Sequence, residues 1–115
     1  MMEVIKQQEG VFEIHVQGKI RKEDYDFIPR LESEVERYGT VNLYCEIESI
    51  DGIEPGAVWE DLKFGVNHYD SFERVAIVGN QKWVEWMTRL AKPFNKATVK
   101  VFAPEQLEEA KNWVS

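Results

Sequence analysis

The sequence is poor in the residues that build disulfide frameworks and metal centres. Its 115 residues include one cysteine, Cys45, and two histidines. A lone cysteine excludes an internal disulfide, and its place within an apolar segment favours a small buried hydrophobic residue over a nucleophile or a metal ligand. No HExxH or comparable metal-binding spacing occurs anywhere in the chain. We therefore expect no metal and no cofactor.

Long apolar runs and an excess of basic residues are also missing. The longest apolar run is far too short to span a membrane, and the first ten residues lack the apolar core of a signal peptide, so residence in the cytoplasm is the expectation. The 14 basic residues are outnumbered by 21 acidic ones, giving a net charge of -7. This charge disfavours nucleic acid and anionic membranes as partners, although a local apolar patch can still dock on lipid.

The segment 72–92 organises the rest of the chain. Val75–Val78 is a continuous apolar run, the pattern of a central strand in a parallel sheet. Gly79 and Asn80 then make a turn, and the period changes to that of an amphipathic helix from Gln81 onward. A turn from a parallel strand into a helix lies at the carboxyl edge of the sheet, where open α/β folds place their ligands.

The N-terminal part predicts a hairpin followed by a broken helix. Residues 4–17 alternate apolar and polar side chains around a turn at Gly10, with His15 in the polar set and therefore expected to be a solvated histidine. Residues 21–38 have helical periodicity that Pro29 interrupts. We expect either a kink at the proline, or a first turn at 22–26 and a main helix that restarts at the proline.

The remaining segments complete the predicted fold. Val41–Ile47 alternates as a strand with one buried face and Tyr44 on the polar one, 57–69 is helical, 97–101 is a last strand ending at Val101, and Pro104 opens a final helix. The order is ββαβαβαβα. It predicts a single α/β domain over residues 1–115, with a mixed sheet of about five strands, an antiparallel hairpin and then parallel strands. About four helices are expected, gathered on one face.

This order, the acidic loop 48–56 and the phrases WEDLKFG, ERVAIVGNQKWVEWM and LEEAKNW resemble the SpoIIAA-like family of the STAS (sulfate transporter and anti-sigma factor antagonist) superfamily. In the anti-sigma antagonists a phosphorylatable hydroxyl stands at the start of the second helix. The matching residues here are Asp51–Glu54, without a hydroxyl; Ser49 is nearest and lies between Glu48 and Asp51, where like charges oppose a phosphate. The family also resembles CRAL-TRIO lipid-binding domains in fold, which implies a module able to hold an apolar ligand or touch a membrane.

Two polar segments are candidate ion sites. The carboxylates of Glu46, Glu48, Asp51 and Glu54 lack the regular spacing of a calcium loop, so a solvated acidic turn is the favoured interpretation. The segment 79–81 precedes a helix, where free N–H groups can bind an anion, but a tight turn with an asparagine cap explains it without a ligand.

A group of large apolar side chains belongs to the second and third predicted helices. These side chains form either ordinary core or a crevice that admits an apolar ligand. Phe64 falls on the polar side of its helix and is expected to be exposed there. The candidate ligand-binding residues are Trp59, Phe64, Trp83, Trp86 and Met87.

The predicted function is a non-enzymatic binding module for an apolar small molecule or a membrane surface. The alternative is a regulatory protein-interaction module that lacks the usual phosphoacceptor, with another protein or a second copy of the chain as its partner. An enzyme is not expected, because no nucleophile, base and orienting group can be assembled from these residues.

Overall fold

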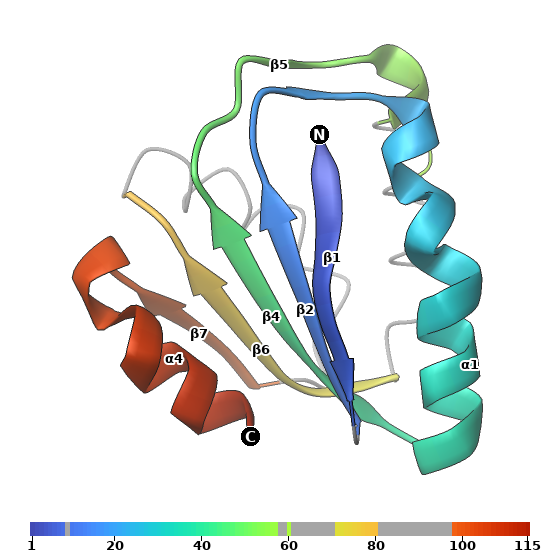
Figure 1. Ribbon diagram of the computed structural model, residues 1–115, viewed down its shortest axis with the longest axis vertical. Helices are drawn as coiled ribbons and strands as arrows, with labels where there is room; N and C mark the ends of the chain where they lie inside the picture. The colour runs from blue at the N-terminus through green and yellow to red at the C-terminus, as the bar shows by residue number, and fades with distance from the viewer. Residues whose placement is uncertain (9, 58–59, 61–70, 81–97) are drawn as a thin grey trace.

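The computed structural model describes residues 1–8, 10–57, 60, 71–80 and 98–115. Its centre is a five-stranded sheet with the order β1-β2-β4-β6-β7, in which β1 runs antiparallel to β2 and every other neighbouring pair is parallel (Figure 1). The strands are β1 (Met2–Gln8), β2 (Val11–Val16), β4 (Val41–Ile47), β6 (Phe72–Val78) and β7 (Thr98–Phe102). The predicted hairpin and the interior position of Val75–Val78 are thus confirmed.

The first helical region is divided near the proline, which is the second of the two expected alternatives. A 3₁₀ segment, η1 (Lys22–Phe27), leads into α1 (Ile28–Tyr38), and Pro29 occupies the first turn of α1, where its missing N–H costs no helical hydrogen bond. Gly39 ends the helix with a φ of 83°, a conformation that glycine adopts without strain.

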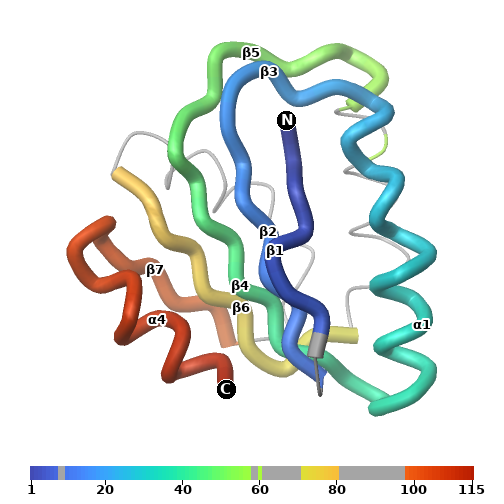
Figure 2. Tube along the Cα trace, viewed as in Figure 1, coloured from blue at the N-terminus to red at the C-terminus, as the bar shows by residue number. Residues whose placement is uncertain are grey.

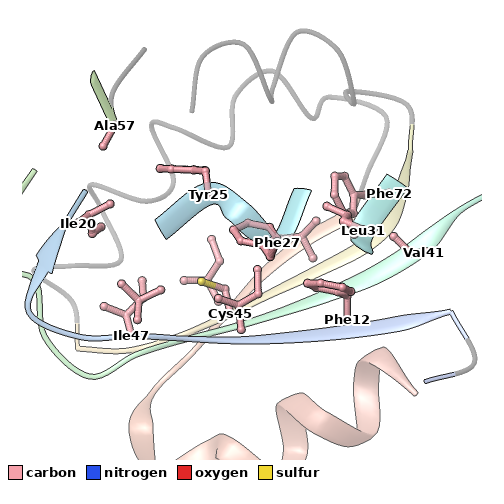
Figure 3. Close-up of a cluster of buried hydrophobic side chains, with 14 of the residues drawn as sticks. Phe12, Ile20, Tyr25, Phe27, Leu31, Val41, Cys45, Ile47, Ala57 and Phe72 are labelled. Atoms are coloured by element: carbon pink, nitrogen blue, oxygen red, sulfur yellow. The ribbon is translucent and has the colours of Figure 1, made fainter. Parts of the chain in front are cut away.

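The described helices cover both faces of the sheet, so the expectation that helices gather on one face is wrong. A large cluster that includes Phe12, Phe27, Leu31 and Cys45 packs between the sheet and η1–α1 (Figure 3). On the opposite face, 3₁₀ segment η2 (Pro104–Gln106) leads into α4 (Leu107–Val114), which packs against β4 and β6.

The core beneath α4 includes Tyr44, which the alternation had placed on the polar face, and Phe102, one residue beyond the predicted end of the last strand. Tyr44 is fully buried rather than polar-facing, because its ring packs with Ala76 and Phe102 under the helix. In β7 the buried end is Phe102, whereas Val101 is 43% exposed. Because β4 is covered on both faces, it buries side chains that point to either face, and an interpretation with a single buried face cannot predict this.

A second, two-stranded sheet was not predicted. β3 (Lys19–Ile20) pairs in parallel with β5 (Gly52–Ile53), and the two strands lie side by side in Figure 2. The N–H of Asp51 donates to the carbonyl of Gly18 (3.0 Å), and the N–H of Glu54 donates to that of Ile20 (2.9 Å). A two-residue strand is too short to show an alternating pattern in the sequence, so it is recognised only from its pairing with a distant segment. This sheet holds the acidic loop against the segment that follows β2.

β1 lies at the edge of the main sheet and contains a bulge. The register shifts between Val4 and Lys6, which leaves Ile5 as the extra residue, 50% exposed. Such a bulge interrupts an edge strand and disfavours pairing with another chain. None of the described helices has the length and apolar character needed to cross a membrane.

Candidate functional site

The candidate site is a cavity of about 350 Å³ at the carboxyl ends of three parallel strands. Its wall comes from β2, β4, β6 and the start of the C-terminal helical region, on the face that α4 covers. The residues that line it are His15, Glu46, Ile47, Glu48, Val78, Gly79, Asn80, Pro104 and Leu107. The cavity therefore includes Gly79 and Asn80, the turn that the sequence had placed at the ligand-binding edge.

Strand register brings the polar residues of the cavity together. His15 of β2 is paired with Glu46 of β4, which is paired with Val78 of β6. Directly paired residues on neighbouring strands point to the same face, so His15 and Glu46 emerge side by side. Glu48 follows the end of β4, and its N–H donates to the carbonyl of Val16 (2.9 Å).

These side chains form a connected polar network. Nε2 of His15 lies 3.1 Å from Oε2 of Glu48 and 3.5 Å from Oε2 of Glu46. The hydroxyl of Tyr44 donates to Oε1 of Glu46 at 2.8 Å. The His15 side chain is only 18% exposed, so the expectation of a solvated histidine is wrong. The alternation could not show that Glu46 and Glu48 lie beside the His15 side chain, because they come from a distant part of the sequence.

Tyr44 serves the network as a hydrogen-bond donor. Burial of the ring, followed by the hydrogen bond to Glu46, raises the pKa of the Tyr44 phenol well above its usual range. The phenol therefore stays protonated and keeps Oε1 of Glu46 engaged, which leaves Oε2 directed at His15.

Glu13 lies two residues before His15 and therefore on the same face of β2. It is paired with Tyr44 across the sheet and is only 5% exposed, although the alternation had placed it on a wetter face. Nζ of Lys6, the residue paired with it on β1, lies 3.9 Å from Oε2 of Glu13. This second ion pair extends the polar strip toward the edge of the sheet.

The acidic loop does not converge on one point. Glu46 and Glu48 face His15, whereas Oε1 of Glu54 accepts the backbone N–H of Lys22 at 3.2 Å. Within the described part of the chain, no group of three histidine, cysteine or acidic residues is placed to hold a metal ion.

The segment 79–81 is the candidate anion site, and one of its backbone N–H groups already has a hydrogen-bond partner within the protein. The N–H of Gly79 donates to the carbonyl of Phe102 at 3.2 Å, which ties the end of β6 to β7. Gln81 lies outside the described residues. The structure thus favours the tight-turn interpretation for Gly79.

Ser49 is hydrogen-bonded to the segment that follows β2. Its Oγ accepts the backbone N–H of Gly18 at 3.2 Å, in a partly buried position beside the β3–β5 sheet. The hydroxyl thus has a structural partner, and the expectation that it is not a phosphoacceptor stays a prediction.

The crevice predicted from the tryptophans lies outside the described residues, so it stays a prediction. The residues concerned are Trp59, Phe64, Trp83, Trp86 and Met87. Conversely, sequence reasoning missed the assembly of His15 with Glu46 and Glu48. The available signal was the placement of polar residues at the carboxyl ends of two strands that proved to be neighbours.

Two comparisons with known proteins agree on the family. The model of the SpoIIAA-like family matches residues 11–115. The chain is also similar to a crystal structure of an uncharacterized protein from the DUF3478 family with a SpoIIAA-like fold, from Shewanella loihica PV-4. The two share 32% sequence identity with a TM-score of 0.74, and the match covers 100% of this chain and 93% of that one. No curated protein matches the sequence. The chain belongs to the SpoIIAA-like family.

Proposed function

We propose that the protein is a small-molecule-binding module whose ligand occupies the cavity at the carboxyl edge of the sheet. The cavity itself carries this proposal. Its volume of about 350 Å³ lies near the lower end of the range of roughly 300–1,000 Å³ that is typical of ligand pockets. A cavity of this size suits a small metabolite rather than a long lipid chain.

The lining supports binding by a combination of apolar and polar contacts. Ile47, Val78, Pro104 and Leu107 contribute apolar surface, and the polar network lies beside them. Ligand sites are commonly built this way, with apolar area providing affinity and a few polar groups fixing orientation. The sequence predicts an apolar small molecule as ligand, and the apolar part of this wall suits such a molecule, whereas the polar network adds a polar requirement.

The chemistry of the cavity supports binding without catalysis. Tyr44 stays protonated and buried, so it cannot serve as a nucleophile or a base. His15 beside Glu46 resembles a base with its orienting carboxylate, but the described residues that line the cavity include no serine, cysteine, threonine or lysine to be activated.

The experiment is a fragment screen by two-dimensional amide NMR on the full chain. Fragments that bind in the cavity shift the amide signals of Glu46–Glu48 and Val78–Asn80. Leu107→Trp adds a large side chain at the cavity wall and should abolish these shifts. The control is Glu108→Trp, which places the same side chain at the next, exposed position of α4, outside the lining.

The two variants separate the outcomes. Shifts that survive in Glu108→Trp but are lost in Leu107→Trp support the proposal. If a chemically diverse library yields no fragment that shifts these amides in the wild type, the proposal is wrong. Melting temperatures of both variants show whether Leu107→Trp still folds; if it does not, Leu107→Phe fills part of the same space with a smaller ring and takes its place.

A further inference from the structure

We infer that the ligand of this cavity is a small organic cation, a protonated amine joined to a compact apolar group. This inference rests on the proposed function, because it names the chemical class that the same cavity takes. It comes from the balance of hydrogen-bond donors and acceptors, from the charge of the wall and from the apolar surface beside it.

The network has more acceptors than donors. The two carboxylates of Glu46 and Glu48 present four oxygens, each able to accept more than one hydrogen bond. The Tyr44 hydroxyl donates a hydrogen bond to Oε1 of Glu46, and Nε2 of His15 lies within 3.5 Å of Oε2 of both carboxylates. When Nε2 carries a proton it points at one of these two oxygens at a time, so acceptor capacity stays available to a ligand. A group with several N–H donors, such as an ammonium, matches this surplus.

The charged residues of the cavity wall also favour a cation. Among the described residues that line the cavity, two are glutamates and none is lysine or arginine. His15 carries a positive charge only when it is protonated. A carboxylate or phosphate ligand would meet like charges, whereas a cation is attracted locally by Glu46 and Glu48 and over longer distances by the net charge of -7.

A bare metal ion fits the site less well than an organic cation. No group of three potential metal ligands is assembled in the described part of the chain. In addition, Oε1 of Glu46 already accepts a hydrogen bond from the Tyr44 hydroxyl, and the lining includes the apolar side chains of Ile47, Val78 and Leu107. Hard divalent cations require an oxygen-rich shell, whereas the hydrocarbon part of an amine contacts such a wall favourably.

The two glutamates should differ in their contribution. The Glu46 side chain is 25% exposed and is oriented by Tyr44, whereas that of Glu48 is 62% exposed. Charge-assisted hydrogen bonds in a protected position contribute more than exposed ion pairs, which water and salt screen. Glu46→Gln should therefore weaken amine binding roughly 10- to 100-fold. Glu48→Gln should weaken it only about two- to fivefold.

The test uses three probes that share one ring: cyclohexylamine, cyclohexanol and cyclohexanecarboxylate, each titrated at pH 7.5 and followed by the amide signals of Val78–Asn80. The amine should bind at least about tenfold more tightly than the other two, with the ranking of the two glutamine variants given above. The charge-matched control is Glu36→Gln, an exposed position on α1 across the sheet, which should leave binding unchanged. Raising the salt concentration should weaken the amine alone.

Other results would overturn the inference. Equal binding of all three probes, or tightest binding of the carboxylate, would leave the cavity a ligand site but remove the cation preference. Saturable shifts with magnesium or calcium chloride that the amine does not compete away would mean a metal site instead. If none of the three probes binds while fragments from the screen do, the amine class is wrong and the binding function stands; if nothing binds, the proposed function itself fails.

Discussion

Tyr44 makes a sharp prediction about stability, because its ring and its hydroxyl have separate roles. The side chain is fully buried under α4, and its hydroxyl donates to Oε1 of Glu46. Tyr44→Phe retains the ring and its packing but removes the donor. A hydrogen bond to a charged group typically contributes about 1.5–3 kcal/mol. Since Glu46 is 25% exposed and water can replace part of the lost bond, we expect the free energy of unfolding to fall by roughly 1–2 kcal/mol at neutral pH.

The same variant should change the response to alkaline pH. The pKa of Tyr44 is raised above its ordinary value of 10.0 in the folded protein, so above pH 10 the unfolded chain releases this proton while the folded chain retains it. The stabilisation from the raised pKa is therefore complete below pH 10 and decreases as the pH rises further. The loss is about 1.4 kcal/mol per pH unit for one such group. Phenylalanine has no proton to release, so Tyr44→Phe should lack this component of the slope.

Urea unfolding followed by circular dichroism, at neutral pH and at several pH values above 10, measures both effects. Tyr38→Phe is the matched control, since Tyr38 is 43% exposed and should lose little at either pH. The difference between the wild type and Tyr44→Phe isolates the contribution of this one phenol from that of other titrating groups. If Tyr44→Phe is as stable as the wild type at neutral pH and keeps the wild-type alkaline slope, the assignment of the hydroxyl as a buried donor is wrong.

Two further predictions concern β7 and the loop after β4. Phe102→Ala should lower the free energy of unfolding by about 3–5 kcal/mol, because it opens a cavity beneath α4. Val101→Ala, at the neighbouring position that is 43% exposed, should change the free energy of unfolding by less than about 0.5 kcal/mol. Similar losses in the two variants would contradict the observed burial of β7. Ser49→Ala should lower the free energy of unfolding by about 1 kcal/mol, because the hydrogen bond from the N–H of Gly18 is lost. The intact mass of protein purified from cells should show no phosphate. Phosphate mapped to Ser49 would overturn the structural assignment of this hydroxyl.

The sequence by itself determined those features that depend on neighbouring residues. The apolar run Val75–Val78 predicted a strand with both faces covered, and β6 is an interior strand of the sheet. Gly39 predicted where α1 ends, because glycine tolerates a positive φ, and Pro29 predicted a kink or a helix start, because it lacks a backbone donor. These are local constraints, and no distant contact was needed to read them.

Only the tertiary structure decided which polar residues meet. His15 lies on β2, whereas Glu46 lies on β4 and Glu48 just after it, about thirty residues further along the chain. Their distances of 3.1 and 3.5 Å follow from the parallel register of β2 with β4. Strand register depends on pairing across the sheet, and a change of one residue would turn His15 toward the other face. The burial of Tyr44 was likewise decided at long range, since the period of β4 marks two faces but only the packing of α4 makes the second one a core.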